Sequence, residues 1–151
     1  MRSFSFVGIF CEDVREEVGG THTIVGVLPN SVNIGGLPGM LPKLGAYIRI
    51  HLDKEANPTS LKARIKIPGG TVFEMADFAE LLGLTKDQAK ANNLPFSGLI
   101  AKGTFSPLPI TQVGRIEAIV EMDGTEYICG VLNLIPPELA ATDSSTSAPH
   151  A

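Results

Sequence analysis

Apolar and polar residues alternate most regularly in two neighbouring segments, residues 44–52 and 60–67. Side chains of a strand point alternately to its two faces, whereas this period would scatter apolar residues around a helix. The polar segment 53–59 between them is typical of a hairpin loop. We therefore predict an antiparallel hairpin with one face on the core and one in water. Its expected core positions are Leu44, Ala46, Ile48, Ile50, Leu52, Leu61, Ala63, Ile65 and Ile67.

Further strands are expected on both sides of this hairpin. Residues 3–10 alternate, and residues 21–28 (THTIVGVL) are apolar or β-branched on both faces, as in a central strand covered on both sides. Residues 96–105 also predict a strand. Asp123-Gly124 lies between two alternating runs, a strong signal for a second hairpin over 115–135. The expected core positions of that hairpin are Ile116, Ala118, Val120, Met122, Ile128, Gly130, Leu132 and Leu134.

Helical spacing is confined to residues 74–93. Met75, Phe78 and Leu82 recur at that spacing, and Gly83 is placed to end a first helix. Thr85 is expected to cap a second, shorter helix. Elsewhere, the Pro- and Gly-rich residues 29–43 predict a loop that crosses between sheets, with a short strand at 31–34.

The number and spacing of the predicted strands favour a β-sandwich over a β-barrel. We expect a mainly β protein, an antiparallel β-sandwich of the immunoglobulin or C2 type with about seven or eight strands and a short helical insertion. A small β-barrel is the alternative. The sandwich is expected to occupy residues 1–137 as one domain, followed by a disordered polar tail at 138–151.

Charge and composition narrow the possible environment and partners. The net charge of −4 argues against a protein that mainly holds nucleic acid or an anionic membrane. No apolar run approaches a membrane span, and the N-terminus has no signal-peptide pattern. Because Cys11 and Cys129 lie far apart in no metal-like spacing, we expect reduced thiols in a cytoplasmic protein.

One stretch resembles a known family. Residues 10–20 (FCEDVREEVGG), followed by the apolar-Gly-apolar step of residues 23–27, resemble the opening of a family of bacterial and phage-associated proteins with no assigned activity. The resemblance covers about the first 30 residues. It implies a β-rich fold and brings no catalytic residues.

The same stretch is the candidate metal site. Four acids surround Arg15, and hard cations such as Ca²⁺ or Mg²⁺ take oxygen ligands. The alternative is a hydrophilic turn in which Arg15 pairs with Asp13. The candidate metal residues are Glu12, Asp13, Glu16 and Glu17.

The predicted outward face of residues 44–67 is the candidate binding surface. Residues 43–66 contain six basic and two acidic residues, a net of +4 in an acidic chain. Cations beside an aromatic ring can contact an acidic partner, whereas the alternative is a solvated face that prevents edge aggregation. The candidate partner-binding residues are Tyr47, Arg49, His51, Lys62, Arg64 and Lys66.

No pattern in the chain predicts catalysis. His51 and Asp53 share a strand face, a weak acid–base cue, but no nucleophile elbow or Cys-His signature accompanies them. The acids around Cys11 would raise its pKa and make it a poor nucleophile. We therefore expect a non-enzymatic interaction module without a cofactor that binds a protein or joins an assembly. A divalent-metal domain or metal-dependent enzyme is the alternative.

Overall fold

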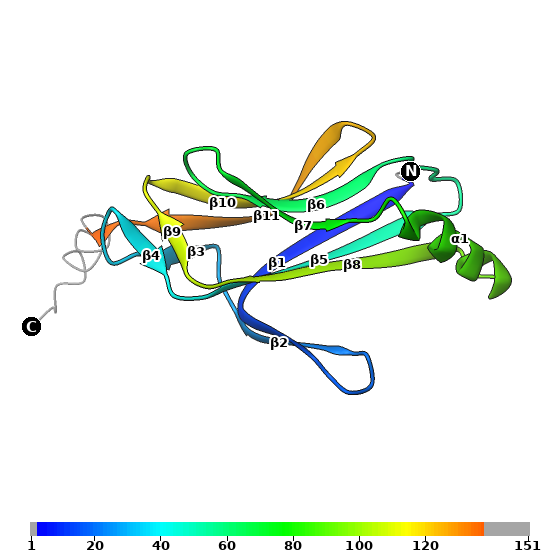
Figure 1. The fold of residues 1–151 in the computed structure, drawn as a ribbon, viewed down its shortest axis with the longest axis horizontal. Coiled ribbons are helices and arrows are strands. Elements are labelled where there is room, and N and C mark those ends of the chain that lie inside the picture. The colour runs from blue at the N-terminus through cyan, green and yellow to red at the C-terminus, as the bar shows by residue number, and fades with distance from the viewer. Residues whose placement is uncertain (1–2, 138–151) are drawn as a thin grey trace, which may run out of the picture.

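The computed structural model describes residues 3–137, which form two β-sheets packed face to face, with one helix at an end (Figure 1). Sheet A has four strands in the order β2-β1-β5-β8, and each strand runs antiparallel to its neighbours in the sheet. Its strands are β1 (Phe4–Glu16), β2 (His22–Val27), β5 (Leu44–Asp53) and β8 (Phe96–Phe105).

Sheet B has five strands in the order β3-β11-β10-β6-β7. Only β3 runs parallel to its neighbour, β11, and the other pairs are antiparallel. Its strands are β3 (Ser31–Asn33), β6 (Leu61–Lys66), β7 (Val72–Asp77), β10 (Gly114–Met122) and β11 (Thr125–Ile135). A small two-stranded sheet joins β4 (Gly39–Leu41) to β9 (Leu108–Ile110), and α1 (Leu81–Ala91) follows β7.

The core lies between the two sheets and contains the residues expected from the alternation. On β5 the inward residues Ile48 and Ile50 are fully buried, and on β6 so are Leu61 and Ile65. Alternation on a strand predicts burial of one face, and here both strands bury that face in one shared cluster. The mainly β class and the sandwich are thus confirmed, with eleven strands within residues 3–137 rather than about seven or eight. Neither sheet closes into a barrel.

The prediction that residues 44–67 form a hairpin is wrong. β5 pairs with β1 and β8 in sheet A, whereas β6 pairs with β10 and β7 in sheet B. The segment between them crosses from one sheet to the other. Alternating apolar residues require only that one face of each strand is buried in the core. Two strands that face one another across the core meet this requirement as well as two hydrogen-bonded strands do.

β2 is an edge strand, not the central strand that its apolar sequence predicts. It pairs only with β1, and Val27 remains 62% exposed. β1 is also longer than residues 3–10, because it continues through the acidic segment to Glu16, where a turn of residues 17–21 leads into β2. β-branched residues suit any extended backbone, so they do not distinguish a central strand from an edge.

The helical region differs from its prediction as well. Residues 72–77 are a strand, and one helix rather than two follows. Gly83 lies inside α1, and Thr85 does not cap a helix, because its Oγ1 donates to the carbonyl of Leu81 at 2.8 Å. Phe78 and Leu82 are nevertheless buried as expected, since they cover the end of the core.

The second hairpin forms as predicted, with one irregularity. The register shifts between Ala118 and Ile119, so Cys129 lies opposite no residue of β10. Beyond this bulge the faces of β11 are exchanged. Ile128, expected in the core, is therefore 52% exposed, and Tyr127 turns inward to pack against Phe4 at 5.1 Å between ring centroids.

Candidate functional site

The six residues predicted to form one binding surface lie on opposite sides of the molecule. Because β5 and β6 belong to different sheets that share a core, their outward faces point away from one another. Tyr47, Arg49 and His51 lie on the outward face of sheet A, opposite the inward Ile48 and Ile50. Lys62, Arg64 and Lys66 lie on the outward face of sheet B.

Two of the three predicted cations on sheet B, Lys62 and Arg64, are paired with carboxylates of other strands. Arg64 forms an ion pair with Glu121 at 2.7 Å and donates a hydrogen bond to Glu126, while Lys62 lies 4.0 Å from Asp77. Cross-strand pairs of opposite charge stabilise a sheet modestly. Four bases face five acids there, namely Lys62, Arg64, Lys66, Arg115, Glu74, Asp77, Glu117, Glu121 and Glu126. This side of the sandwich therefore lacks the positive surface that the sequence predicts.

The outward face of sheet A has a different composition. The register places Val7 of β1, Arg49 of β5 and Ile100 of β8 in one row across three strands. Val7 is 55% and Ile100 40% exposed, so apolar surface lies open on both sides of a cation. The next row contains Ile9, Tyr47 and Lys102.

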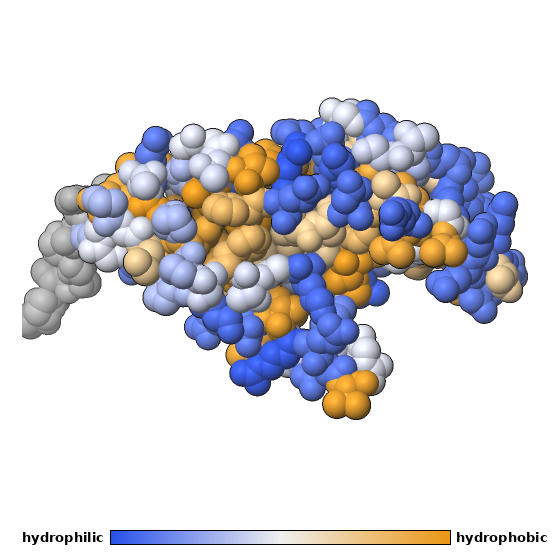
Figure 2. All heavy atoms as spheres, in the orientation of Figure 1, coloured by the Kyte–Doolittle hydropathy of each residue, from blue (hydrophilic) through white to orange (hydrophobic). Residues whose placement is uncertain are grey.

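A two-stranded arm, residues 12–26, flanks this face. Figure 1 shows the β1–β2 turn projecting away from the sandwich on the side of sheet A, and Figure 2 shows the notch between this projection and the end that bears α1. Lys102 holds the arm, since its Nζ lies 2.5 Å from Glu16 Oε2 and 3.2 Å from His22 Nε2. The His22 ring also meets Tyr47 edge to face at 5.8 Å.

Two histidines on this face accept hydrogen bonds from cations. Arg49 Nε lies 3.2 Å from His51 Nε2, so the guanidinium donates to the ring nitrogen. His51 also packs against Phe96 at 5.2 Å, and Phe96 is 49% exposed. His51 forms no hydrogen bond with Asp53, whose Oδ1 instead accepts from the amides of Glu55 and Ala56. The acid–base pair suggested by their spacing is therefore not assembled.

We call this surface the sheet A face. It comprises the outward side chains of β1, β5 and β8 together with the arm residues that touch them. Its members are Val7, Ile9, His22, Tyr47, Arg49, His51, Phe96, Ile100 and Lys102. Sequence reasoning missed Val7, Ile100 and Lys102, although the alternation of residues 3–10 and 96–105 would have put them on outward faces.

The acidic segment does not assemble a metal site. Within residues 3–137, no three His, Cys, Asp or Glu side chains gather closely enough to hold a metal ion. The segment is a strand, so Glu12 and Glu16 project to the face opposite Asp13.

Two of the four acids of that segment, Asp13 and Glu16, have cations as partners instead. Asp13 pairs with Lys43 at 2.9 Å and with Arg15 at 3.2 Å, and these bonds lower the pKa of its carboxyl. The bond to Lys102 likewise lowers the pKa of Glu16. The pairing of Arg15 with Asp13 expected from the sequence is present, and Asp13 and Glu16 serve the arm as ion-pair partners.

Both cysteines are free thiols with raised pKa values. Burial is the main cause for Cys11, and the Asp13 carboxylate adds to it. Burial raises the pKa of Cys129 to about 11. Thiols held protonated at neutral pH are poor nucleophiles, which agrees with the expectation for Cys11.

The chain matches no known family model, and no curated protein has a detectably similar sequence. The resemblance of residues 10–27 to a bacterial and phage-associated family therefore stays a prediction. Among residues 3–137, no helix has the length and apolar character needed to cross a membrane.

Proposed function

We propose that this protein is a non-enzymatic binding module and that the sheet A face binds a protein partner. The observation that carries the proposal is the row Val7, Arg49 and Ile100, which exposes two aliphatic side chains on a regular three-stranded surface. Apolar side chains on a rigid sheet, bordered by polar groups, are typical of protein–protein contact surfaces.

The charges around the row indicate the chemistry of the partner. Arg49 donates to a ring nitrogen of His51, and the ion pairs within residues 3–137 leave it without a carboxylate. An arginine beside aromatic and aliphatic groups is a frequent hot spot, since its guanidinium can bind a carboxylate in two-pronged geometry. The partner segment should therefore present apolar side chains with an Asp or Glu between them.

The two sheets provide a matched comparison. On sheet B, Arg64 is paired with Glu121 and Glu126, and Lys62 lies near Asp77. A partner that binds there would have to break these pairs before it gained any of its own. On the sheet A face, a partner can bind Arg49 without first breaking an ion pair. This difference favours the sheet A face over the outward face of sheet B as the contact surface.

Affinity purification of the full chain from its native cells, followed by mass spectrometry, tests the proposal. We expect the substitutions Ile100→Glu and Arg49→Glu each to abolish recovery of a partner that the wild type retains. Lys66→Glu, an exposed change on sheet B, is the matched control and should retain it. Recovery of the same partners by all four proteins, with all variants folded by circular dichroism, would refute the assignment of this face.

A further inference from the structure

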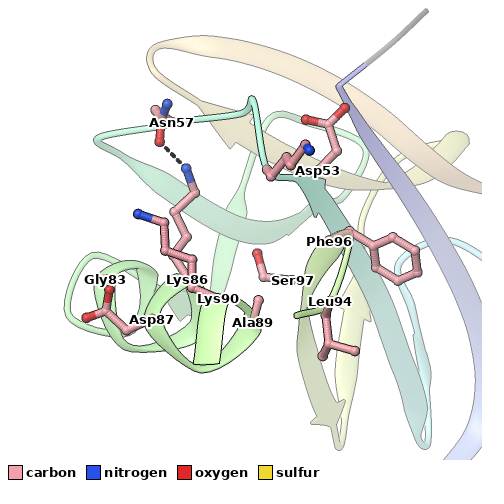
Figure 3. A pocket seen from close by; sticks show the side chains of 11 residues that line it. Asp53, Asn57, Gly83, Lys86, Asp87, Ala89, Lys90, Leu94, Phe96 and Ser97 are labelled. Atoms are coloured by element: carbon pink, nitrogen blue, oxygen red, sulfur yellow. Dashed lines mark hydrogen bonds between the residues drawn. The ribbon is translucent and has the colours of Figure 1, made fainter. Parts of the chain in front are cut away.

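A separate cavity lies at the end of the sandwich, between α1, the start of β8 and the loop that joins β5 to β6. Its volume is about 330 Å³, at the small end of the range for ligand sites. Figure 3 shows Lys86 and Lys90 rising from α1 on the side of Asn57, with the Ser97 hydroxyl directed into the space beside them. The sheet A face does not account for this cavity.

Ser97 is the first indication that the cavity receives a ligand. It takes an inward position on β8 and is only 6% exposed, the one buried polar residue among those described. Within residues 3–137, the Ser97 hydroxyl forms no side-chain hydrogen bond. Every fully buried side-chain oxygen or nitrogen atom among these residues does have a hydrogen-bond partner, so the Ser97 hydroxyl is not fully buried. The hydroxyl must therefore be reached from the cavity, where it can donate to a bound group.

The lysines supply the second indication. Lys86 and Lys90 are one helical turn apart, a spacing at which like charges repel, and Lys54 lines the same space. None of the ion pairs within the described chain involves these three residues. Lys86 donates only to the neutral Asn57 side chain. An anion between the lysines would replace this repulsion with attraction.

The two carboxylates that line the cavity do not cancel this charge at its centre. Asp53 Oδ1 accepts from the backbone amides of Glu55 at 2.8 Å and Ala56 at 3.1 Å, so it is engaged in shaping the loop. Asp87 lies on the far side of the lysines from Ser97 (Figure 3). The space around the hydroxyl is therefore bordered by cations and by the apolar side chains of Leu94 and Phe96.

From this arrangement we infer that the cavity beside α1 binds a small organic anion. The anionic group is a carboxylate or a phosphate, held by the Ser97 hydroxyl and by Lys86 and Lys90. A short apolar body, no larger than the cavity, contacts Leu94 and Phe96. Phe96 also belongs to the sheet A face, but Ser97, Lys86 and Lys90, which hold the anionic group, do not, so the inference does not depend on the partner proposed for that face.

Amide chemical shifts of the ¹⁵N-labelled full chain, titrated with phenyl phosphate, benzoate, inorganic phosphate and neutral benzamide, test the inference. We expect phenyl phosphate or benzoate at millimolar concentration to shift the amides of Ser97, Lys86 and Lys90, with inorganic phosphate weaker and benzamide inactive. Added salt should weaken the binding. Absence of shifts at these amides with every anion, or equal shifts with benzamide, would overturn it.

Variants separate a specific site from general attraction to lysines. Ser97→Ala should weaken the anion by about tenfold, the value of a hydrogen bond to a charged group. Lys90→Gln should weaken it severalfold, whereas Lys66→Gln on sheet B is the matched control and should leave it unchanged. If Ser97→Ala and Lys90→Gln, folded by their melting curves, bind as the wild type does, the site is refuted whatever the fate of the sheet A face.

Discussion

The two sheets lie close together where Gly8 of β1 faces Gly130 of β11, and this contact makes Gly130→Ala a sharp test of the packing. A Cβ built on Gly130 of β11 would lie 2.9 Å from the carbonyl oxygen of Gly8 of β1. It would also lie 3.1 Å from the carbonyl carbon of Gly8. These neighbours are backbone atoms of β1, which is held in sheet A between β2 and β5, so they cannot rotate away as a side chain would. The substitution must push the sheets apart at this point.

The size of the effect follows from two opposing contributions. Replacing a strand glycine removes flexibility from the unfolded chain, which by itself stabilises by about 0.5–1 kcal/mol. Overpacking a closely packed interior costs about 1–3 kcal/mol. We expect a net loss of about 1–2 kcal/mol in the free energy of unfolding, which lowers the melting temperature of a domain of this size by about 3–10 °C.

Urea unfolding followed by circular dichroism measures this loss, and Gly98→Ala is the matched control. Gly98 lies in β8, and a Cβ there would meet its nearest neighbour, Cδ2 of His51, at an ordinary 3.7 Å. We expect Gly98→Ala to leave stability unchanged or slightly raised. If Gly130→Ala is as stable as Gly98→Ala, the close approach of β1 and β11 is wrong.

Two further predictions concern a thiol and the arm. Because the pKa of Cys129 is raised from 9.0 to about 11, its folded thiol stays protonated where the unfolded one ionises. Stability should therefore fall as the pH rises from about 9 to 11, and Cys129→Ala should flatten that part of a plot of urea midpoint against pH. An unchanged slope would contradict the burial of this thiol. Lys102→Met removes the bonds to Glu16 and His22, so amide exchange should quicken in residues 12–26 while the melting temperature changes little. Equal exchange in both proteins would show that other contacts hold the arm.

Local patterns determined which residues are buried over most of the chain. Ile48 and Ile65 lie in the core as their alternation predicts, and Asp123-Gly124 turns the second hairpin as predicted. Asp123 also has a role that no local pattern contains. Its carboxylate accepts from the amides of Thr59 at 2.8 Å and Ser60 at 2.9 Å, which joins this turn to the β5–β6 connection. These bonds lower the pKa of the Asp123 carboxyl.

Strand pairing could not be predicted in the same way. Alternation gives the face of each strand but not its neighbour, so residues 44–67 were expected to pair with themselves when they belong to different sheets. The bulge at Cys129 reversed the face of Ile128 because an unpaired residue shifts the alternation by one. The first error concerns pairing between segments distant in sequence, and the second concerns an irregularity within a hairpin that alternation does not reveal.

For the candidate sites too, the sequence predicted the face of a strand on which each residue lies but not its neighbours in space. The sequence by itself determined that Arg49 and Arg64 would project from strands toward solvent, since this depends only on residue parity. Only the tertiary structure decided that they lie on opposite sides, with Arg64 neutralised by Glu121 and Arg49 beside Val7 and Ile100. It also decided that Ser97 opens into a lysine-lined cavity. The physical reason is that charge compensation and cavities depend on distances between segments remote in sequence, which local periodicity does not encode.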